Sequence, residues 1–275
     1  MVFVTVRDVV LYVDRAGRGR HLLLLHGALG THHQFAEMRK QLADDFDLLM
    51  PDQRGVGAST RGSRVASMSV LAEDMMELLK CLGVTRTHVL GYSMGAAIAL
   101  ELAVKFPQQV DRLVLVSGSA GGASERVTVA RRALDRADDV LSGRWLEERC
   151  RMTYSRRFLD LHPSVLSEAA RKRIGGRSKE VVLNRLEARR QHDTTGRLDL
   201  IGAPTLVIAG GGDQLVDPKN SVVLADGIRD ARLLVYEDCG HAVLAERADE
   251  VVSDVRAFLL EGTSSRAGAP LGVDS

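Results

Sequence analysis

The pentapeptide Gly91-Tyr92-Ser93-Met94-Gly95 follows the apolar run His88–Leu90, which predicts a strand, and opens the run Met94–Phe106, which predicts a helix. In this strand–turn–helix context, Gly-x-Ser-x-Gly is typical of a tight turn that holds a serine in a strained backbone conformation. The two glycines leave room for the neighbouring strand and helix. Ser93 is therefore expected to project its hydroxyl at the edge of a sheet, near a helix N-terminus that favours developing negative charge. A turn that merely needs glycines is the competing interpretation of the pentapeptide alone.

Short apolar runs of the kind that parallel sheets bury alternate along the chain with helical patterns. The helical patterns include Leu71–Leu82 and Val251–Leu259. This alternation predicts the α/β class, with a mostly parallel, twisted sheet of about eight strands and helices on both faces. A ligand site is then expected beyond the carboxyl ends of the strands. The predicted strands are Phe3–Val6, Val9–Val13, Leu22–Leu25, Leu48–Met50, His88–Leu90, Leu113–Val116, Thr205–Ile208 and Arg232–Tyr236.

The segment Ser119–Ala203 interrupts this alternation, because none of its 85 residues belongs to a strand pattern. An unstructured loop of that length is uncommon in a compact domain, so we expect a helical lid inserted into an α/β core made of residues 1–118 and 204–261. Residues 262–275 are rich in Gly, Ser, Ala and Pro, and are expected to form a flexible tail. The helical patterns of the segment are Val127–Leu141, Trp145–Tyr154 and Val181–Arg190.

A serine nucleophile needs a base, because a free hydroxyl reacts weakly. Of the eight histidines, His241 lies between the last predicted strand and the last predicted helix, at the carboxyl edge of the sheet. The base in turn needs an acid that fixes its tautomer. Asp213 follows the strand Thr205–Ile208 closely and is preferred over Asp217, which precedes a proline and is typical of a helix start. The predicted catalytic residues are Ser93, Asp213 and His241.

The oxyanion that forms at an attacked carbonyl needs hydrogen-bond donors. The stretch His26-Gly27-Ala28-Leu29-Gly30 follows a buried strand and can direct a backbone N–H at the Ser93 hydroxyl. We assign the oxyanion hole to Met94, the residue after the nucleophile, and Ala28, with Leu29 as the alternative to Ala28. His26 is interpreted as a residue that braces this loop rather than as a base.

The other histidines and a cysteine have plainer interpretations. His88 precedes the serine turn within a strand, which favours a packed core residue, and Cys239 is interpreted as a small loop filler. His32 and His33 either reach the mouth of the pocket or simply start a helix. His192 has no partner that the sequence identifies.

The composition excludes several functional classes. The 275 residues are 45% hydrophobic and 27% charged, as in ordinary globular proteins, and a net charge of +1 gives no reason to expect nucleic-acid binding. The three cysteines form no C-x-x-C pair, which favours a reducing compartment and neither metal site nor cofactor. The N-terminus lacks a signal-peptide pattern, and no apolar run approaches the ~18 residues of a membrane span. A cytoplasmic protein that does not bind membranes is expected, and the sequence leaves its oligomeric state open.

The predicted lid is basic, with 18 Lys and Arg against 12 Asp and Glu, a balance of +6 against −5 for the remainder. Such a lid can attract an anionic substrate or an acidic carrier protein, although a solvated helical surface is the competing interpretation. The aromatic residues Trp145 and Tyr154 either line a substrate pocket with Leu29 and Tyr92 or pack the lid against the body.

Together these motifs resemble the α/β-hydrolase fold superfamily, in the branch of small lidded esterases, enol-lactonases, carbon–carbon hydrolases and cofactor-free haloperoxidases. The resemblance spans roughly Val9 to Leu260 and implies the fold and the triad, but not the substrate. It also implies that Asp52 and Arg54 have a mainly structural role. The matching stretches are His26-Gly27-Ala28, Asp52-Gln53-Arg54-Gly55-Val56-Gly57-Ala58-Ser59, Gly91–Gly95, Gly210–Asp213 and Gly240-His241.

The leading functional hypothesis is a cofactor-free serine hydrolase that cleaves a small to medium carboxylic ester, lactone or thioester through an acyl-enzyme. The first alternative is a biosynthetic enzyme of the same fold that uses the triad for cyclisation, carbon–carbon cleavage or decarboxylation. The second is a non-catalytic sensor that closes its lid on a small molecule.

Overall fold

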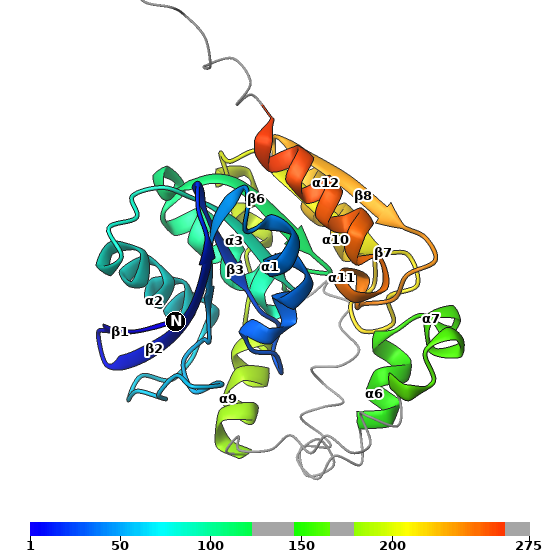
Figure 1. Cartoon of the computed structure of the whole chain (residues 1–275), viewed down its shortest axis with the longest axis horizontal. Helices are drawn as coiled ribbons and strands as arrows, with labels where there is room; N and C mark the ends of the chain where they lie inside the picture. The colour runs from blue at the N-terminus through cyan, green and yellow to red at the C-terminus, as the bar shows by residue number, and fades with distance from the viewer. Residues whose placement is uncertain (123–145, 166–178, 262–275) are drawn as a thin grey trace, which may run out of the picture.

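The computed structural model describes residues 1–122, 146–165 and 179–261, and an eight-stranded sheet forms its centre (Figure 1). The spatial order is β1-β2-β4-β3-β5-β6-β7-β8. From β3 to β8 every pairing is parallel, whereas β2 runs antiparallel to both β1 and β4. This confirms the predicted mostly parallel sheet. The strands are β1 (Val2–Val6), β2 (Val9–Gly17), β3 (Arg20–Leu25), β4 (Phe46–Pro51), β5 (Thr87–Tyr92), β6 (Val110–Val116), β7 (Thr205–Gly210) and β8 (Ala231–Tyr236).

Helices cover both faces of the sheet, and the alternation of side chains along β3 separates two apolar clusters. Leu23 and Leu25 pack with residues of α2, α3 and α10, whereas Leu22 and Leu24 pack on the opposite face with residues of α1, α11 and α12. Successive strand side chains point to opposite faces, so a central strand that is apolar throughout serves both layers. These helices are α1 (Ala36–Leu42), α2 (Met68–Cys81), α3 (Met94–Lys105), α10 (Lys219–Gly227), α11 (Val243–Glu246) and α12 (Ala248–Leu260), with η1 (His32–Phe35) and η2 (Pro107–Gln109) as short 3-10 turns.

The second strand is longer than its apolar pattern predicts. It continues past Val13 to Gly17 and pairs with β4 over this polar stretch. Arg15 donates two hydrogen bonds to the Asp47 carboxylate across the pair, at 2.9 and 2.6 Å. Cross-strand pairing of opposite charges stabilises a sheet, but it leaves no hydrophobic signal in the sequence.

The described part of 119–203 contains helices and no strand; an isolated bridge joins Gly121 to Asp193. The segment connects β6 to β7, which are neighbours in the sheet, and its helices α6, α7 and α9 lie at the lower edge of the sheet in Figure 1. The predicted helix Val127–Leu141 and the predicted tail 262–275 lie outside the described residues. The elements present are α6 (Leu146–Thr153), α7 (Arg156–Leu161), α9 (Lys179–Arg190) and the 3-10 helix η3 (Thr195–Leu200).

Within the described ranges, no helix has both the length and the apolar character that a membrane span needs.

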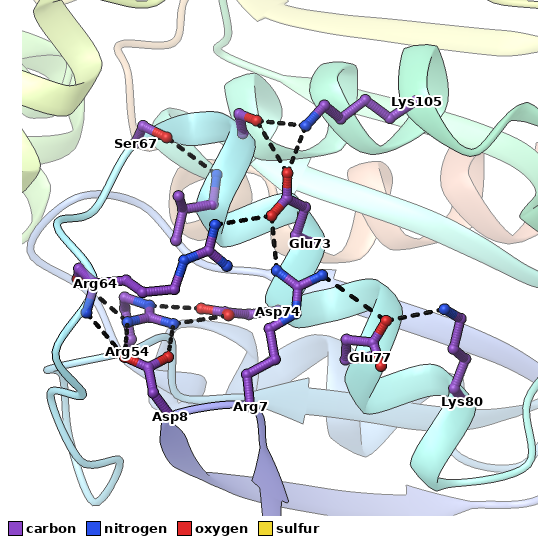
Figure 2. A network of polar contacts seen from close by, with 12 residues as sticks. Arg7, Asp8, Arg54, Arg64, Ser67, Glu73, Asp74, Glu77, Lys80 and Lys105 are labelled. Carbon is purple, nitrogen blue, oxygen red and sulfur yellow. Dashed lines mark hydrogen bonds and ion pairs between the residues drawn. The ribbon is translucent and has the colours of Figure 1, made fainter.

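A buried arginine joins the first hairpin, the loop after β4 and helix α2 (Figure 2). Arg54 donates to both carboxylate oxygens of Asp74, at 2.6 and 2.8 Å, and to Asp8 at 3.0 Å. The Arg54 guanidinium, together with the backbone N–H of Arg64, holds the pKa of Asp8 well below its usual range. The side chains of Arg54 and Asp74 are at most 2% exposed. These contacts fit the structural role that the resemblance implies for Arg54.

Replacing Arg54 with alanine is expected to lower the free energy of unfolding by about 3–5 kcal/mol, because the buried Asp74 carboxylate loses its counter-ion. Urea unfolding measures the change. Arg86→Ala is the matched control, since this arginine is 62% exposed and pairs with Asp111 at the surface, where ion pairs contribute about 0–1 kcal/mol. Equal losses in the two variants would contradict a stabilising role for the buried network.

Candidate active site

Ser93 occupies the turn between β5 and α3 in a conformation that side chains rarely adopt, with φ 56° and ψ −116°. Its backbone N–H donates to Val116 O on β6 at 2.8 Å. The flanking glycines allow close approach: a Cβ on Gly91 would lie 2.6 Å from the Ala96 Cα, and one on Gly95 would lie 1.9 Å from Leu25 O. Sterics at the strand–helix crossing therefore require both glycines of the pentapeptide and hold Ser93 at the edge of the sheet.

A continuous chain of hydrogen bonds joins the three residues that the sequence predicts as a triad. His241 Nε2 lies 2.9 Å from Ser93 Oγ, and His241 Nδ1 lies 2.7 Å from Asp213 Oδ2. The other Asp213 oxygen accepts from the backbone N–H groups of Leu215 and Val216, at 2.8 and 2.9 Å. A carboxylate at Nδ1 selects the tautomer whose Nε2 is free to accept the serine proton. His241 and Asp213 are 5% and 7% exposed, so these hydrogen bonds are shielded from water except at the serine.

The competing carboxylate, Asp217, lies just before α10, in the stretch that leads into this helix. Its Oδ1 accepts from the backbone N–H of Lys219 at 2.9 Å. This contact agrees with the helix-start interpretation of Asp217, and the structure brings Asp213 rather than Asp217 to the histidine.

The backbone around His241 is anchored at three consecutive residues. The His241 carbonyl accepts from Ser117 Oγ at 2.9 Å and from the Tyr92 hydroxyl at 3.3 Å. Gly240 N donates to Glu246 Oε1 at 3.0 Å, and Ala242 N donates to Thr153 O, at the end of α6, at 2.9 Å. These bonds fix the ring position through the main chain.

Glu246 also binds the start of α7, because Ser155 N donates to its Oε1 at 3.0 Å and Ser155 Oγ bonds its Oε2. The sequence analysis missed Glu246. The available signal in the sequence was its position shortly after His241, at the end of the short helix α11 that follows the histidine loop.

The loop after β3 lies against Ser93, since a Cβ on Gly27 would be 3.4 Å from the Ser93 Cβ. His26 braces the loop: its Nδ1 donates to Gly27 O at 2.9 Å and its Nε2 accepts from Gln53 N at 3.2 Å. Arg185 of α9 donates to Ala28 O at 3.1 Å and to Gln53 Oε1 at 2.5 Å. These contacts confirm the bracing interpretation of His26 and add Arg185, which the sequence analysis missed.

The two residues predicted as oxyanion donors line one cavity with Ser93. Met94 is the first residue of α3, so its N–H has no acceptor within the helix. Ala28 belongs to the braced loop. The cavity thus brings Ala28, Met94, Ser93 and His241 to a common space.

This cavity has a volume of about 360 Å³ and a mostly apolar wall, to which Met38, Leu186 and Leu215 contribute. Of the predicted pocket residues, Leu29, Tyr92 and Tyr154 line it, and Trp145 lies outside the described residues. Burial, and secondarily Asp213, raises the pKa of the Tyr92 hydroxyl, which keeps it neutral. In the part of the wall that the structure describes, the charged groups are Arg149, Arg189 and Glu37, and His33 also lines the cavity. Sequence analysis had not singled out Arg149 and Arg189 as pocket residues.

Apart from His33, which reaches the cavity as one of its two predicted positions allowed, the other histidines have structural contacts. Burial lowers the pKa of His88 to about 4 and that of His192 to about 3, and the core interpretation of His88 is confirmed by its 1% exposure. His32 begins a short 3-10 turn, and its Nδ1 contacts Asp52 at 2.8 Å. Over the residues that the structure describes, no cluster of three or more His, Cys, Asp or Glu could hold a metal ion.

Comparisons with known proteins point in one direction. The α/β hydrolase fold family model matches residues 20–248. A protein of Azorhizobium caulinodans provisionally assigned as the carbamate hydrolase RutD is 30% identical over 245 residues, which cover 88% of this chain and 92% of that protein. Lipase 1 of Psychrobacter immobilis is 30% identical over 261 residues, covering 91% of this chain and 80% of the lipase.

Among solved structures, the enol-lactonase from Burkholderia xenovorans superposes with a TM-score of 0.85 at 23% identity, covering 94% of this chain and 100% of that one. At this identity the likeness concerns the fold alone.

Proposed function

Because the chain belongs to the α/β hydrolase fold family, we propose that it is a serine hydrolase that cleaves a carboxylic ester, lactone or thioester through an acyl-enzyme. The observation that carries the proposal is the hydrogen-bonded chain from Ser93 through His241 to Asp213. The lipase among its relatives supports an ester substrate, and the relative assigned as a carbamate hydrolase makes a carbamate worth testing.

In the proposed first half-reaction, Ser93 Oγ attacks the carbonyl carbon while His241 Nε2 takes the hydroxyl proton. Asp213 orients the ring and stabilises the imidazolium that forms. The backbone N–H groups of Met94 and Ala28 donate to the oxyanion. The tetrahedral intermediate collapses when His241 returns the proton to the leaving oxygen, nitrogen or sulfur, and the acyl group remains on Ser93.

In the second half-reaction, water attacks the acyl carbonyl and gives a proton to His241. Collapse releases the carboxylic acid and restores the Ser93 hydroxyl. We further propose that the 119–203 segment is a lid over the site. The cavity wall contributed by α6 and α9, through Thr153 and Leu186 among others, supports this role.

A fluorophosphonate probe tests the nucleophile. Intact-mass measurement is expected to show one adduct per chain, formed as Ser93 Oγ displaces fluoride, and no adduct in Ser93→Ala. Ser253→Ala is the control that keeps the adduct, because Ser253 is exposed on α12. An unlabelled parent chain that also fails to hydrolyse 4-nitrophenyl esters, a thioester, a lactone and a carbamate would reject the proposal in favour of a sensor.

A further inference from the structure

One guanidinium group of α9 reaches the loop that carries the predicted oxyanion donor Ala28. Arg185 Nε donates to Ala28 O at 3.1 Å, and Arg185 Nη2 donates to Gln53 Oε1 at 2.5 Å. Arg185 is 2% exposed, so water competes little for these bonds. Arg185 and Ala28 lie 157 residues apart in the sequence. A helix of the 119–203 segment therefore holds a loop of the α/β core beside the reacting serine.

Gln53 carries this contact on to the start of the same loop. Its side-chain Nε2 donates to His26 O at 2.9 Å, and its backbone N–H donates to His26 Nε2 at 3.2 Å. His26 Nδ1 in turn donates to Gly27 O at 2.9 Å. Gln53 is fully buried. Arg185 thus holds the loop at two places, directly at Ala28 and through Gln53 at His26.

The anchored carbonyls fix the directions of the N–H groups in this loop, because the C=O and N–H of a planar trans peptide point in opposite directions. The peptide that bears the Ala28 N–H is held through Gly27 O, which accepts from His26 Nδ1 and, at 3.1 Å, from Gly30 N. The next peptide is held through Ala28 O by Arg185. Ala28 therefore lies between two anchored peptides, which restricts rotation of its N–H.

Arg185 reaches the loop from outside the cavity. Ala28 and Leu29 line the cavity, as does Leu186, the next residue of α9. Arg185 is not part of the described lining and instead borders a separate small pocket with Asn184. A residue in this place can affect the reaction through the loop without touching the substrate.

Resting on the proposed hydrolase function, we propose that Arg185 is a positioning residue, whose guanidinium holds the loop so that the Ala28 N–H meets the oxyanion. A guanidinium suits this role because its donors have fixed directions and can bind two acceptors at once, whereas a lysine ammonium is a point charge on a flexible stem. Donors that are held in place before the reaction stabilise the charge that develops in the transition state. The 119–203 segment then contributes to catalysis as well as to the cavity wall.

Hydrolysis of 4-nitrophenyl butyrate by Arg185→Met tests this role, because methionine keeps much of the side-chain length and removes both donors. We expect kcat to fall about tenfold to a hundredfold, the scale of a misplacement of ~1 Å, while KM stays within about threefold of the parent value. A raised KM with an unchanged kcat would show that Arg185 binds substrate and would overturn the proposal.

Arg190→Met is the matched control on the same helix. Arg190 is 51% exposed and pairs with Glu187 at 2.6 Å, so its kcat and KM are expected to stay within about twofold of the parent values. Equal kinetics in Arg185→Met and Arg190→Met would contradict a positioning role.

An inhibitor that forms an oxyanion separates positioning from a general loss of structure. Ser93 Oγ adds to the carbonyl carbon of propyl trifluoromethyl ketone, the hydroxyl proton passes to His241, and the ketone oxygen becomes an oxyanion. The inhibition constant for Arg185→Met is expected to rise by about the factor by which kcat/KM falls, because both report binding of the oxyanion. Arg185→Lys, which can supply one donor, is expected to lie between the parent and Arg185→Met. An unchanged inhibition constant in Arg185→Met overturns the proposal.

Hydrogen exchange of the backbone amides of residues 26–30 tests the loop without turnover. Faster exchange in Arg185→Met than in Arg190→Met supports the proposal, and equal rates overturn it. If Arg185→Met does not fold, Arg185→Lys carries all three comparisons, and parent values of kcat, inhibition and exchange in that variant overturn the two-point contact. If fluorophosphonate labels no chain, the proposed function fails, and the exchange comparison still decides whether Arg185 holds the loop.

Discussion

Replacing Ser93 with alanine is expected to lower kcat for ester hydrolysis by on the order of 10⁶, the scale known for loss of a triad nucleophile. The Ser93 Oγ atom forms the acyl bond in the proposed mechanism. It is also the atom that lies 2.9 Å from His241 Nε2, within hydrogen-bond reach of the base. Initial rates on a 4-nitrophenyl ester measure the loss. The fold is expected to persist, because alanine fits the turn as serine does, and thermal melting checks this.

The outcome of this substitution also separates the mechanisms that the triad could serve. Activity within tenfold of the parent would show that no acyl-enzyme forms and that His241 acts directly as an acid–base group, as in the biosynthetic alternative. Residual catalysis far below the parent but above water is compatible with the proposal, since oxyanion donors and binding act without the nucleophile.

Asp213→Asn is expected to lower kcat by on the order of 10⁴, because an amide at this position favours the wrong imidazole tautomer. The substitution keeps the shape of the side chain, whose Oδ2 lies 2.7 Å from His241 Nδ1. The matched control is Asp217→Asn, four residues further along the chain, where the carboxylate accepts a hydrogen bond from Lys219 N at the start of α10.

The ranking of the two variants decides between the carboxylates. Asp217→Asn is expected to change kcat less than about tenfold, through local effects on the start of α10. A larger loss for Asp217→Asn than for Asp213→Asn would show that the structure pairs the histidine with the wrong acid. Thermal melting of both variants separates a loss of catalysis from a loss of fold.

Much of the fold could be predicted because its central strands are apolar throughout. Leu22–Leu25 and Leu113–Val116 are buried on both faces, and a strand of this kind stands out as a continuous apolar run. The extension of β2 through Asp14 and Arg15 could not be predicted, because cross-strand ion pairing rather than burial holds it. The strand order β2-β4-β3 could not be predicted from the apolar pattern either, because the choice of neighbouring strands depends on contacts between distant segments of the chain.

The candidate triad was predictable because each member follows a strand and so lies at one edge of the sheet. The cavity wall was not, because a helix rich in arginine hides its buried face. In α9, Val181, Val182, Arg185, Leu186 and Arg189 are all at most 8% exposed, and their spacing is that of one helix face. Arginine is normally counted as a polar residue, so Arg185 and Arg189 interrupt the apolar pattern of this face. Their helical spacing from the valines and Leu186 was the available signal that they share the buried face.

The backbone conformation of Ser93 lowers the stability of the fold, whereas the proposed catalysis needs the serine at this position. A side chain at φ 56° and ψ −116° costs about 1–3 kcal/mol, which surrounding structure must offset. Glycine would adopt the same conformation without that cost. Selection for thermal stability alone would therefore favour the loss of the serine. If variants of this protein were selected by melting temperature alone, replacements of Ser93 would be enriched. Such a selection therefore needs a parallel screen for turnover.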